Sequence, residues 1–269
     1  MKKSFTLWQL PSQGSSQMSS YVIKSATGKI IVIDGGMTCD GIYLKKFLAS
    51  HGNHVDSWFL THPHLDHIDA LTWILLNQGD LKIGKIYASF PSLEWIKKYE
   101  AIYADAIQEF NTALKKSGRK YIDINYGDIF DVDGIHIEIL SNVNLEITFN
   151  AINNSSIVIK ISDEIKSILF LADLGSEAGD KLLEIIDHKK LKADYVQMAH
   201  HGQNGVNKNF YEVVQPEYCL WPTPLWLWNN DNGGGEGSGP WLTLEVRQWM
   251  KELKVKKNFV SAFGIIEIK

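Results

Sequence analysis

Residues 62–67 contain three histidines and one aspartate, in the order His62, His64, Asp66 and His67. An apolar stretch expected to be a buried strand (55–60) precedes them, and a stretch with apolar residues at helical spacing (68–76) follows. Imidazole nitrogens and carboxylate oxygens are zinc ligands, and neither a strand nor a helix turns all four side chains to one point. The alternative, solvated histidines in a surface loop, leaves this density unexplained. The segment therefore predicts a metal site in a turn, with all four residues as ligands.

Two other predicted strands also end in residues that can bind metal. The apolar run 168–172 ends at Asp173, and the run 195–199 is followed by His200 and His201. Taken singly, such an aspartate is commonly a turn former and a histidine pair has many uses. Open α/β sheets build their sites from the carboxyl ends of several strands, so the three strand ends together extend the predicted metal site.

The remaining pattern alternates strand-rich blocks with amphipathic helices. Strands are expected at 5–10, 20–25, 30–34, 55–60, 135–140, 146–149, 156–161, 167–171, 195–199, 259–263 and 265–268, and helices at 43–50, 68–76, 93–116, 177–188 and 242–253. This order allows two stacked sheets with helices outside, or one doubly wound parallel sheet. The motifs decide between the two.

These motifs resemble the metallo-β-lactamase superfamily. The HxHxDH signature matches residues 62–67 without a gap, Asp34-Gly35-Gly36 after a buried strand resembles the family's first acidic motif, and Asp173 resembles its bridging aspartate. The resemblance implies an α/β fold of four layers, a αββα sandwich of two mixed sheets with helices on the outer faces. It implies a single domain over 1–269, with two halves at roughly 1–134 and 135–269.

A closer resemblance lies within that superfamily. The run from Asn153 to Ile159, the strand end at Asp173 and the segment Ala199-His200-His201-Gly202 are similar to the hydrolase domain of DNA-uptake competence proteins and to bacterial phosphorylcholine esterases. Those relatives lack the isolated histidine that usually stands between the HxHxDH motif and the bridging aspartate. In this chain only His136 lies in that interval, within a predicted strand, and it is interpreted as an ordinary strand residue.

The resemblance implies a role for each matching residue. His62 and His64 would hold a first metal, Asp66, His67 and His201 a second, and Asp173 would bridge the two, leaving the first metal with open coordination. The expected cofactor is two Zn²⁺ per chain, with Mn²⁺ or iron as alternatives. Asp34 is expected to orient a ligand histidine, or otherwise to be a turn former. The remaining expected positions are Asn154 and Ser156 behind the ligands, and Asp66 and His200 as catalytic residues.

Two bound zinc ions would lower the pKa of water from about 15.7 to about 7 and so supply hydroxide at neutral pH. We therefore expect hydrolysis of an ester-type bond in a small molecule, and the nearest relatives favour a phosphoester. His200 is a candidate proton donor to the leaving group. The alternatives are a diiron oxidoreductase and a non-catalytic metal-binding domain.

Substrate selection is expected in the tryptophan-rich segment 221–228. Trp221, Trp226 and Trp228 stand beside two prolines and cannot all lie in one regular element. Exposed, they could surround a quaternary ammonium group through cation–π attraction; alternatively, they pack over the core. The following glycine-rich run, 233–239, is expected to be a mobile lid or a flexible loop.

Composition restricts the partners. The chain has 27 Lys and Arg against 31 Asp and Glu, a net charge of −4, so there is no broad basic field for extended nucleic-acid binding. Cys39 and Cys219 are too few for a disulfide framework and are expected to be reduced. Neither a signal peptide nor an apolar run of about 20 residues is visible, so we expect a cytoplasmic protein without a membrane segment. The oligomeric state stays open.

Overall fold

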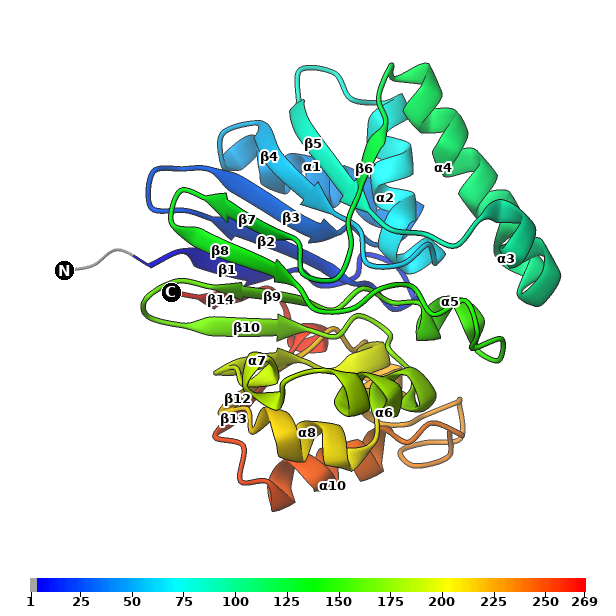
Figure 1. Cartoon of the computed structure of the whole chain (residues 1–269), viewed down its shortest axis with the longest axis vertical. Coiled ribbons are helices and arrows are strands. Elements are labelled where there is room, and N and C mark those ends of the chain that lie inside the picture. The colour runs from blue at the N-terminus through cyan, green and yellow to red at the C-terminus, as the bar shows by residue number, and fades with distance from the viewer. Residues whose placement is uncertain (1–3) are drawn as a thin grey trace.

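The computed structural model describes residues 4–269 and contains two seven-stranded mixed sheets packed face to face (Figure 1). The first sheet has the order β14 (Ile266–Ile268), β1 (Thr6–Gln9), β2 (Ser20–Lys24), β3 (Ile30–Asp34), β4 (His54–Phe59), β5 (Lys82–Ala88) and β6 (Tyr121–Asp123). The second has the order β13 (Lys257–Val260), β12 (Tyr218–Trp221), β11 (Tyr195–Gln197), β10 (Ser167–Phe170), β9 (Ile159–Ser162), β8 (Ile135–Ile139) and β7 (Ile129–Val132).

The sandwich exists because both sheets have one apolar face turned toward the other. Side chains such as Tyr21, Phe59, Ile137 and Phe170 point into the space between the sheets and are buried there. Burial of such side chains is the main favourable term in folding, at roughly 25 cal/mol per Å² of apolar surface. The expected αββα architecture is confirmed.

Helices cover the two outer faces. The first sheet carries α1 (Gly41–Ser50), α2 (Leu65–Leu76) and α4 (Ala104–Lys116), and α3 (Leu93–Tyr99) packs against α4. The second sheet carries α6 (Ser176–Ile185), α7 (His188–Leu191), α8 (Lys208–Val214), α9 (Leu225–Trp228) and α10 (Thr243–Glu252). Short α5 (Ala151–Asn154) lies at one end of the sandwich, close to α3. The 3₁₀ turns are η1 (Thr38–Asp40), η2 (Ala101–Tyr103), η3 (Ala199–Gly202) and η4 (Ser261–Phe263).

Parallel pairing fixes where the functional residues gather. In the first sheet β3, β4, β5 and β6 run parallel, and in the second β10, β11, β12 and β13 do. The carboxyl ends of β4 and β10 point to the same end of the sandwich (Figure 1). The turns that carry the predicted ligands follow β4, β10 and β11, so they meet at this end.

Several expected elements differ in the structure. The expected helix 93–116 is broken, because Glu100 adopts φ −144° and ψ 58° between α3 and η2. The expected strand 146–149 is wrong: this segment has no regular secondary structure, and its Phe149 is 83% exposed. The expected strand 156–161 begins later, at Ile159, and the last part of the expected strand 259–263 forms η4.

The division into halves is also less simple than expected. Strand β7 lies before residue 134 but pairs with β8 in the second sheet, whereas β14, at the end of the chain, pairs with β1 in the first. Within 4–269, no helix has both the length and the apolar character needed to span a bilayer.

Candidate metal centre

The six predicted metal ligands are brought together from four segments. His62 and His64 lie in the turn after β4, Asp66 and His67 in the first turn of α2, Asp173 after β10, and His201 in η3 after β11. All six residues are buried, with relative exposure of 8% or less. Residues more than 100 positions apart thus share one interior site.

The ligand atoms form two groups that share Asp173. The first metal site consists of His62, His64 and Asp173, and the second metal site of Asp66, His67, Asp173 and His201. In each group, one ligand atom per residue can be chosen so that all lie within 4.8 Å of one another. The structure therefore brings the six predicted ligands together in two groups that could each hold a metal ion, with Asp173 in both.

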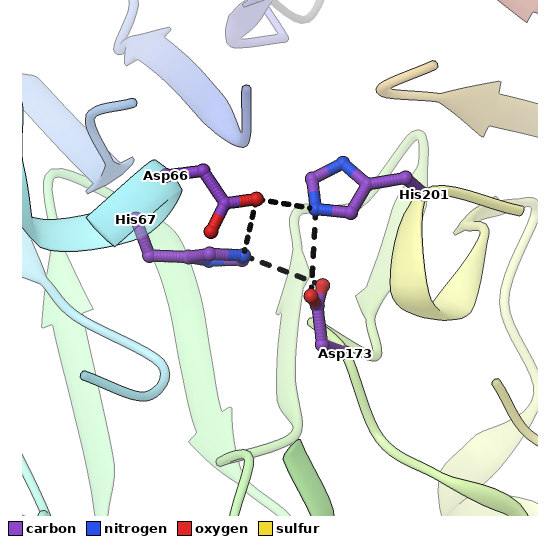
Figure 2. Close-up of side chains that lie close together, drawn as sticks. All are labelled: Asp66, His67, Asp173 and His201. Carbon is purple, nitrogen blue, oxygen red and sulfur yellow. Dashed lines mark ion pairs between the residues drawn. The ribbon is translucent and has the colours of Figure 1, made fainter. Parts of the chain in front are cut away.

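Figure 2 shows the four residues of the second metal site. His201 Nε2 lies 3.0 Å from Asp66 Oδ2 and 3.4 Å from Asp173 Oδ2, and His67 Nε2 lies 3.3 Å from Asp173 Oδ1. In the first metal site, His62 Nε2 lies 3.8 Å from Asp173 Oδ2 and 3.2 Å from His64 Nδ1. Two imidazole nitrogens and a carboxylate oxygen thus face one point in that site as well.

Hydrogen bonds on the far side of the rings orient two of the ligand histidines. His67 Nδ1 donates to Asp34 Oδ2 at 2.7 Å, and His201 Nδ1 donates to the carbonyl of Pro222 at 2.7 Å. Each bond places the ring proton on Nδ1 and leaves Nε2 free to bind a cation. Asp34 itself accepts the backbone N–H of Thr61 at 2.9 Å, which ties it to the start of the histidine turn.

Asn154 and Ser156 support the Asp173 segment rather than touching the ligand atoms. Ser156 Oγ accepts the backbone N–H of Asp173 at 3.2 Å. Asn154 Oδ1 accepts the N–H of Ala178 at 3.2 Å, and Asn154 Nδ2 donates to the carbonyl of Phe149 at 3.0 Å. Ser156 thus holds the backbone at Asp173, and Asn154 links the start of α6 to the backbone of Phe149.

The strand ends at the site adopt unusual backbone conformations. Asp34, Ala172, His200 and His201 have φ of 55°, 50°, 49° and 56°, in the left-handed region that non-glycine residues enter at a cost of about 1–3 kcal/mol. Surrounding contacts hold them there: Gln197 Oε1 accepts the N–H of Ala172 at 2.6 Å, and the Ala172 carbonyl accepts the N–H of His200 at 2.9 Å. The fold thus imposes the conformations that aim the ligands inward.

Unpaired polar atoms test whether these residues suit a metal. Buried polar groups normally find hydrogen-bond partners. Among the described residues, most of the buried side-chain polar atoms without a hydrogen bond belong to the ligand set: His64 Nε2, Asp66 Oδ2, His67 Nε2, both carboxylate oxygens of Asp173 and His201 Nε2. One cation bound at each of the two sites would interact with most of these unpaired atoms, so the donor set fits divalent metals.

Charge supports the same conclusion. Burial raises the pKa of Asp173, but His201 and His67 more than offset it and hold the pKa well below its usual value. Burial lowers the pKa of His201, but Asp173 and Asp66 raise it to about 10. Without a metal, the raised pKa values of His201 and His67 favour a second ring proton on these two histidines, which balances the buried carboxylates. Metal binding would replace these protons, as it does at ligands that must be deprotonated.

His200 lies beside the metal sites rather than in them. Its Nε2 is 3.9 Å from Asp173 Oδ2 and 3.3 Å from Asn153 Nδ2, and its Nδ1 lies 3.3 Å from the carbonyl of Asn204. The Asn204 carbonyl can only accept, so Nδ1 of His200 carries the ring proton. In the neutral ring, Nε2 has no proton and accepts a hydrogen bond from Asn153 Nδ2. Burial lowers the pKa of His200, which favours the neutral ring.

A pocket of about 630 Å³ opens beside His200. Phe149 and Trp241 are its aromatic lining residues, and Glu100, Asn150 and Asn204 are among the polar ones. The described lining contains neither lysine nor arginine. This volume is within the usual range for small-molecule sites, about 300–1,000 Å³.

The expectation that Trp221 contacts substrate is wrong. Trp221 is fully buried at the end of β12, a strand paired on both sides, and its Nε1 donates to Asn258 Oδ1 at 2.8 Å. A Cβ added at Gly202 would lie 2.3 Å from its ring, so the indole packs directly against the turn that carries His201. Trp221 therefore supports a ligand from within the core.

The other two tryptophans of the segment do not line the pocket either. Trp228 packs edge-on against Trp221 and lies under the guanidinium of Arg247, 4.2 Å from its ring centre. Trp226 donates to the carbonyl of Ser15 and contacts Trp241, with 4.8 Å between ring centroids. Trp226 thus fixes Trp241, the tryptophan that does face the pocket.

Sequence reasoning missed Glu100, Phe149, Asn153 and Trp241 near the site. The sequence pattern places Glu100 in a regular helix and Phe149 in a strand, and no motif separates Trp241 from the other tryptophans. Asn153 belongs to the run that resembles the family, but only the structure shows that its buried Oδ1 has no hydrogen-bond partner among the described residues. The glycine-rich loop is fixed locally: Asp231 accepts the N–H groups of Gly233 and Gly235.

Comparison with known proteins identifies the family of the chain. The sequence profile of the metallo-beta-lactamase superfamily matches residues 14–208, so the chain belongs to that superfamily. A search of curated protein sequences gives no match.

Solved structures share the fold at low sequence identity. The metallo-beta-lactamase fold protein YhfI from Bacillus subtilis superposes with a TM-score of 0.61 at 14% identity, covering 99% of this chain and 100% of YhfI. CmlA, a diiron beta-hydroxylase from Streptomyces venezuelae, gives 0.59 at 10% identity, covering 100% of this chain and 55% of CmlA. Yeast PDE1 gives 0.56 at 12% identity, covering 96% and 97%. At these identities the similarity establishes the fold, and the site itself must indicate the reaction.

Proposed function

We propose that this protein is a metal-dependent hydrolase that cleaves an ester bond of a small molecule, with a phosphoester as the preferred substrate. The observation that carries the proposal is the convergence of the two ligand groups on buried atoms that lack hydrogen bonds. The likeness to competence-protein hydrolase domains and phosphorylcholine esterases, read from the motifs, supports the phosphoester.

Two divalent metals suit this donor set, with Zn²⁺ as the expected ion and Mn²⁺ or iron as alternatives. The first would be held by His62, His64 and Asp173, and the second by Asp66, His67, Asp173 and His201. Such ions lower the pKa of water to about 7 and polarise the oxygen of a phosphoryl or carbonyl group. Asp66 and Asp173 contribute by concentrating negative charge where the cations bind.

His200 would contact the substrate, because it lines the pocket and stands 3.9 Å from Asp173. Its Nε2 is a hydrogen-bond acceptor in the present arrangement, and burial lowers the pKa of the ring. Donation of a proton to a leaving group would require that Nε2 first take one up, for example from the attacking water. We therefore propose that His200 receives a proton before it donates one.

The pocket would hold the part of the substrate that does not react. Its described lining has no lysine or arginine to pair with a further phosphate, whereas Phe149 and Trp241 offer apolar ring faces. A neutral or cationic organic group with an apolar face fits this lining best. The charged phosphoryl group would instead lie toward the metal ligands.

The test is a hydrolysis screen with bis-p-nitrophenyl phosphate, p-nitrophenyl phosphate, p-nitrophenylphosphorylcholine and a lactone, each with Zn²⁺, Mn²⁺ or Fe²⁺. We expect turnover of at least one phosphoester that chelation and the Asp173→Asn variant both abolish. Protein that binds metal but hydrolyses none of these esters would overturn the phosphoester proposal. Bound iron with dioxygen consumption in its place would indicate an oxidoreductase.

A further inference from the structure

Glu100 is held in a fixed position close to the first metal site. Its Oε1 accepts the backbone N–H of Ala151 at 2.9 Å, and its Oε2 accepts that of Ile152 at 3.1 Å. These are the first two residues of α5, whose N–H groups have no partner within the helix. Two backbone donors restrain a side chain that would otherwise be mobile, and it is only 17% exposed.

The carboxylate faces one nitrogen of a predicted metal ligand. His64 Nδ1 lies 3.2 Å from His62 Nε2 and points into the first metal site, whereas His64 Nε2 lies 3.7 Å from Glu100 Oε2. The ring also packs against Tyr103, with 4.2 Å between ring centroids. His64 Nε2 is buried and makes no hydrogen bond with any described residue.

The tautomer of His64 follows from this arrangement. A neutral imidazole that binds a cation through Nδ1 must carry its proton on Nε2. That proton then points toward Glu100. Two of the other ligand histidines already have such a partner, since Asp34 accepts from His67 and the Pro222 carbonyl accepts from His201.

We propose that Glu100 is a positioning residue for the first metal site: when a metal binds Nδ1 of His64, the Glu100 carboxylate, 3.7 Å from Nε2 in this structure, accepts a hydrogen bond from Nε2 and so holds Nδ1 toward the metal. The inference rests on the metal centre of the proposed function and is independent of the substrate. The first metal site has three ligand residues against four in the second, so it depends more on each ligand being correctly oriented. Glu100 also joins His64 to α5, which carries Asn153, the neighbour of His200.

Isothermal titration calorimetry tests this role. Zn²⁺ or Mn²⁺ is added to the metal-free protein, and the affinity of each metal site is measured. Glu100→Gln keeps the size of the side chain and one oxygen for the N–H groups of α5, and Glu100→Ala removes both. Loss of the outer hydrogen-bond partner of a metal-bound histidine typically weakens metal affinity about 10–100-fold. We expect a loss of that size at the first site in both variants, with the second site unchanged.

Glu94→Gln is the matched control. It makes the same chemical change at an exposed position of α3, six residues earlier, and should bind both metals as the unmodified protein does. The thermal midpoint of each metal-free variant shows whether the fold is intact.

Two results would overturn the inference. One is unchanged affinity at the first site in both Glu100 variants. The other is an equal loss at both sites together with a lower thermal midpoint, which would show that Glu100 acts only through the stability of α5. Failure of the proposed function would look different, because the unmodified protein would then bind metal without hydrolysing a phosphoester.

Discussion

Replacement of Asp34 by Asn should weaken the second metal site by changing one proton position. Asp34 Oδ2 accepts the Nδ1 proton of His67 at 2.7 Å, and Asp34 Oδ1 accepts the N–H of Thr61 at 2.9 Å. In the Asp34→Asn variant, the amide oxygen at position 34 must accept the backbone N–H of Thr61. The NH₂ group of the same amide therefore faces His67 Nδ1. The ring must then accept at Nδ1 and carry its proton on Nε2, the atom that faces Asp173 and the metal site.

The expected size follows from the loss of one outer-sphere partner. Such changes typically weaken metal affinity about 10–100-fold, which corresponds to about 1.4–2.7 kcal/mol at 25 °C. The first metal site should keep its affinity, because His62 and His64 are not hydrogen-bonded to Asp34 in the described structure. His201 should also keep its tautomer, since the Pro222 carbonyl holds its Nδ1 proton.

Competition with a chromogenic chelator resolves the two binding steps. Asp40→Asn is the matched control: Asp40 is also fully buried and accepts two backbone N–H groups, from Gln13 and Met37, but it is not a neighbour of His67. Circular dichroism establishes that both variants fold. If Asp34→Asn bound two metals with unaltered affinity, Asp34 would not control the tautomer of His67.

Three further changes test the core, the pocket and the N-terminal strand. Trp221→Ala should lower the free energy of unfolding by about 3–5 kcal/mol, measured with urea, because it removes a fully buried indole; a normal stability with a raised KM would contradict this. Trp241→Ala should raise KM several-fold to about tenfold with little change in thermal midpoint, since an aromatic contact contributes about 0.5–1.5 kcal/mol; an unchanged KM would place the substrate elsewhere. Burial raises the pKa of Asp163, but hydrogen bonds from Ser4 and the 165–166 backbone hold it below its usual value, so this carboxylate stabilises the fold above pH about 4 and loses that effect as the pH falls through its folded pKa. Asp163→Asn should therefore lower the thermal midpoint at pH 7 and have less effect at pH 3; equal losses at both would contradict this.

The cluster of candidate metal ligands could be predicted from the sequence because four of its residues are close together in the chain. His62, His64, Asp66 and His67 fall within one turn, and a short turn after a buried strand has few ways to arrange them. Asp173 and His201 could be added because they follow apolar strands, whose carboxyl ends share an edge when the strands are parallel.

The pocket could not be predicted in the same way, because it depends on contacts between distant segments. Trp241 faces the pocket after a loop fixed by Asn230 and Asp231, and Glu100 bonds to α5 some 50 residues later. The prolines exclude one regular element for the tryptophan-rich segment but do not show which of its tryptophans is buried. Trp221 is buried because its strand lies between β11 and β13 in the interior of the sheet. Strand order and register depend on pairing between distant segments, so they cannot be predicted from the sequence of one segment alone.

The most direct test of the metal centre is anomalous X-ray diffraction from crystals grown with Zn²⁺ or Mn²⁺. We expect two peaks in the anomalous difference map, one bounded by His62, His64 and Asp173, and one bounded by Asp66, His67, Asp173 and His201. A map without a peak at either position, in protein shown to be folded, would contradict this expectation.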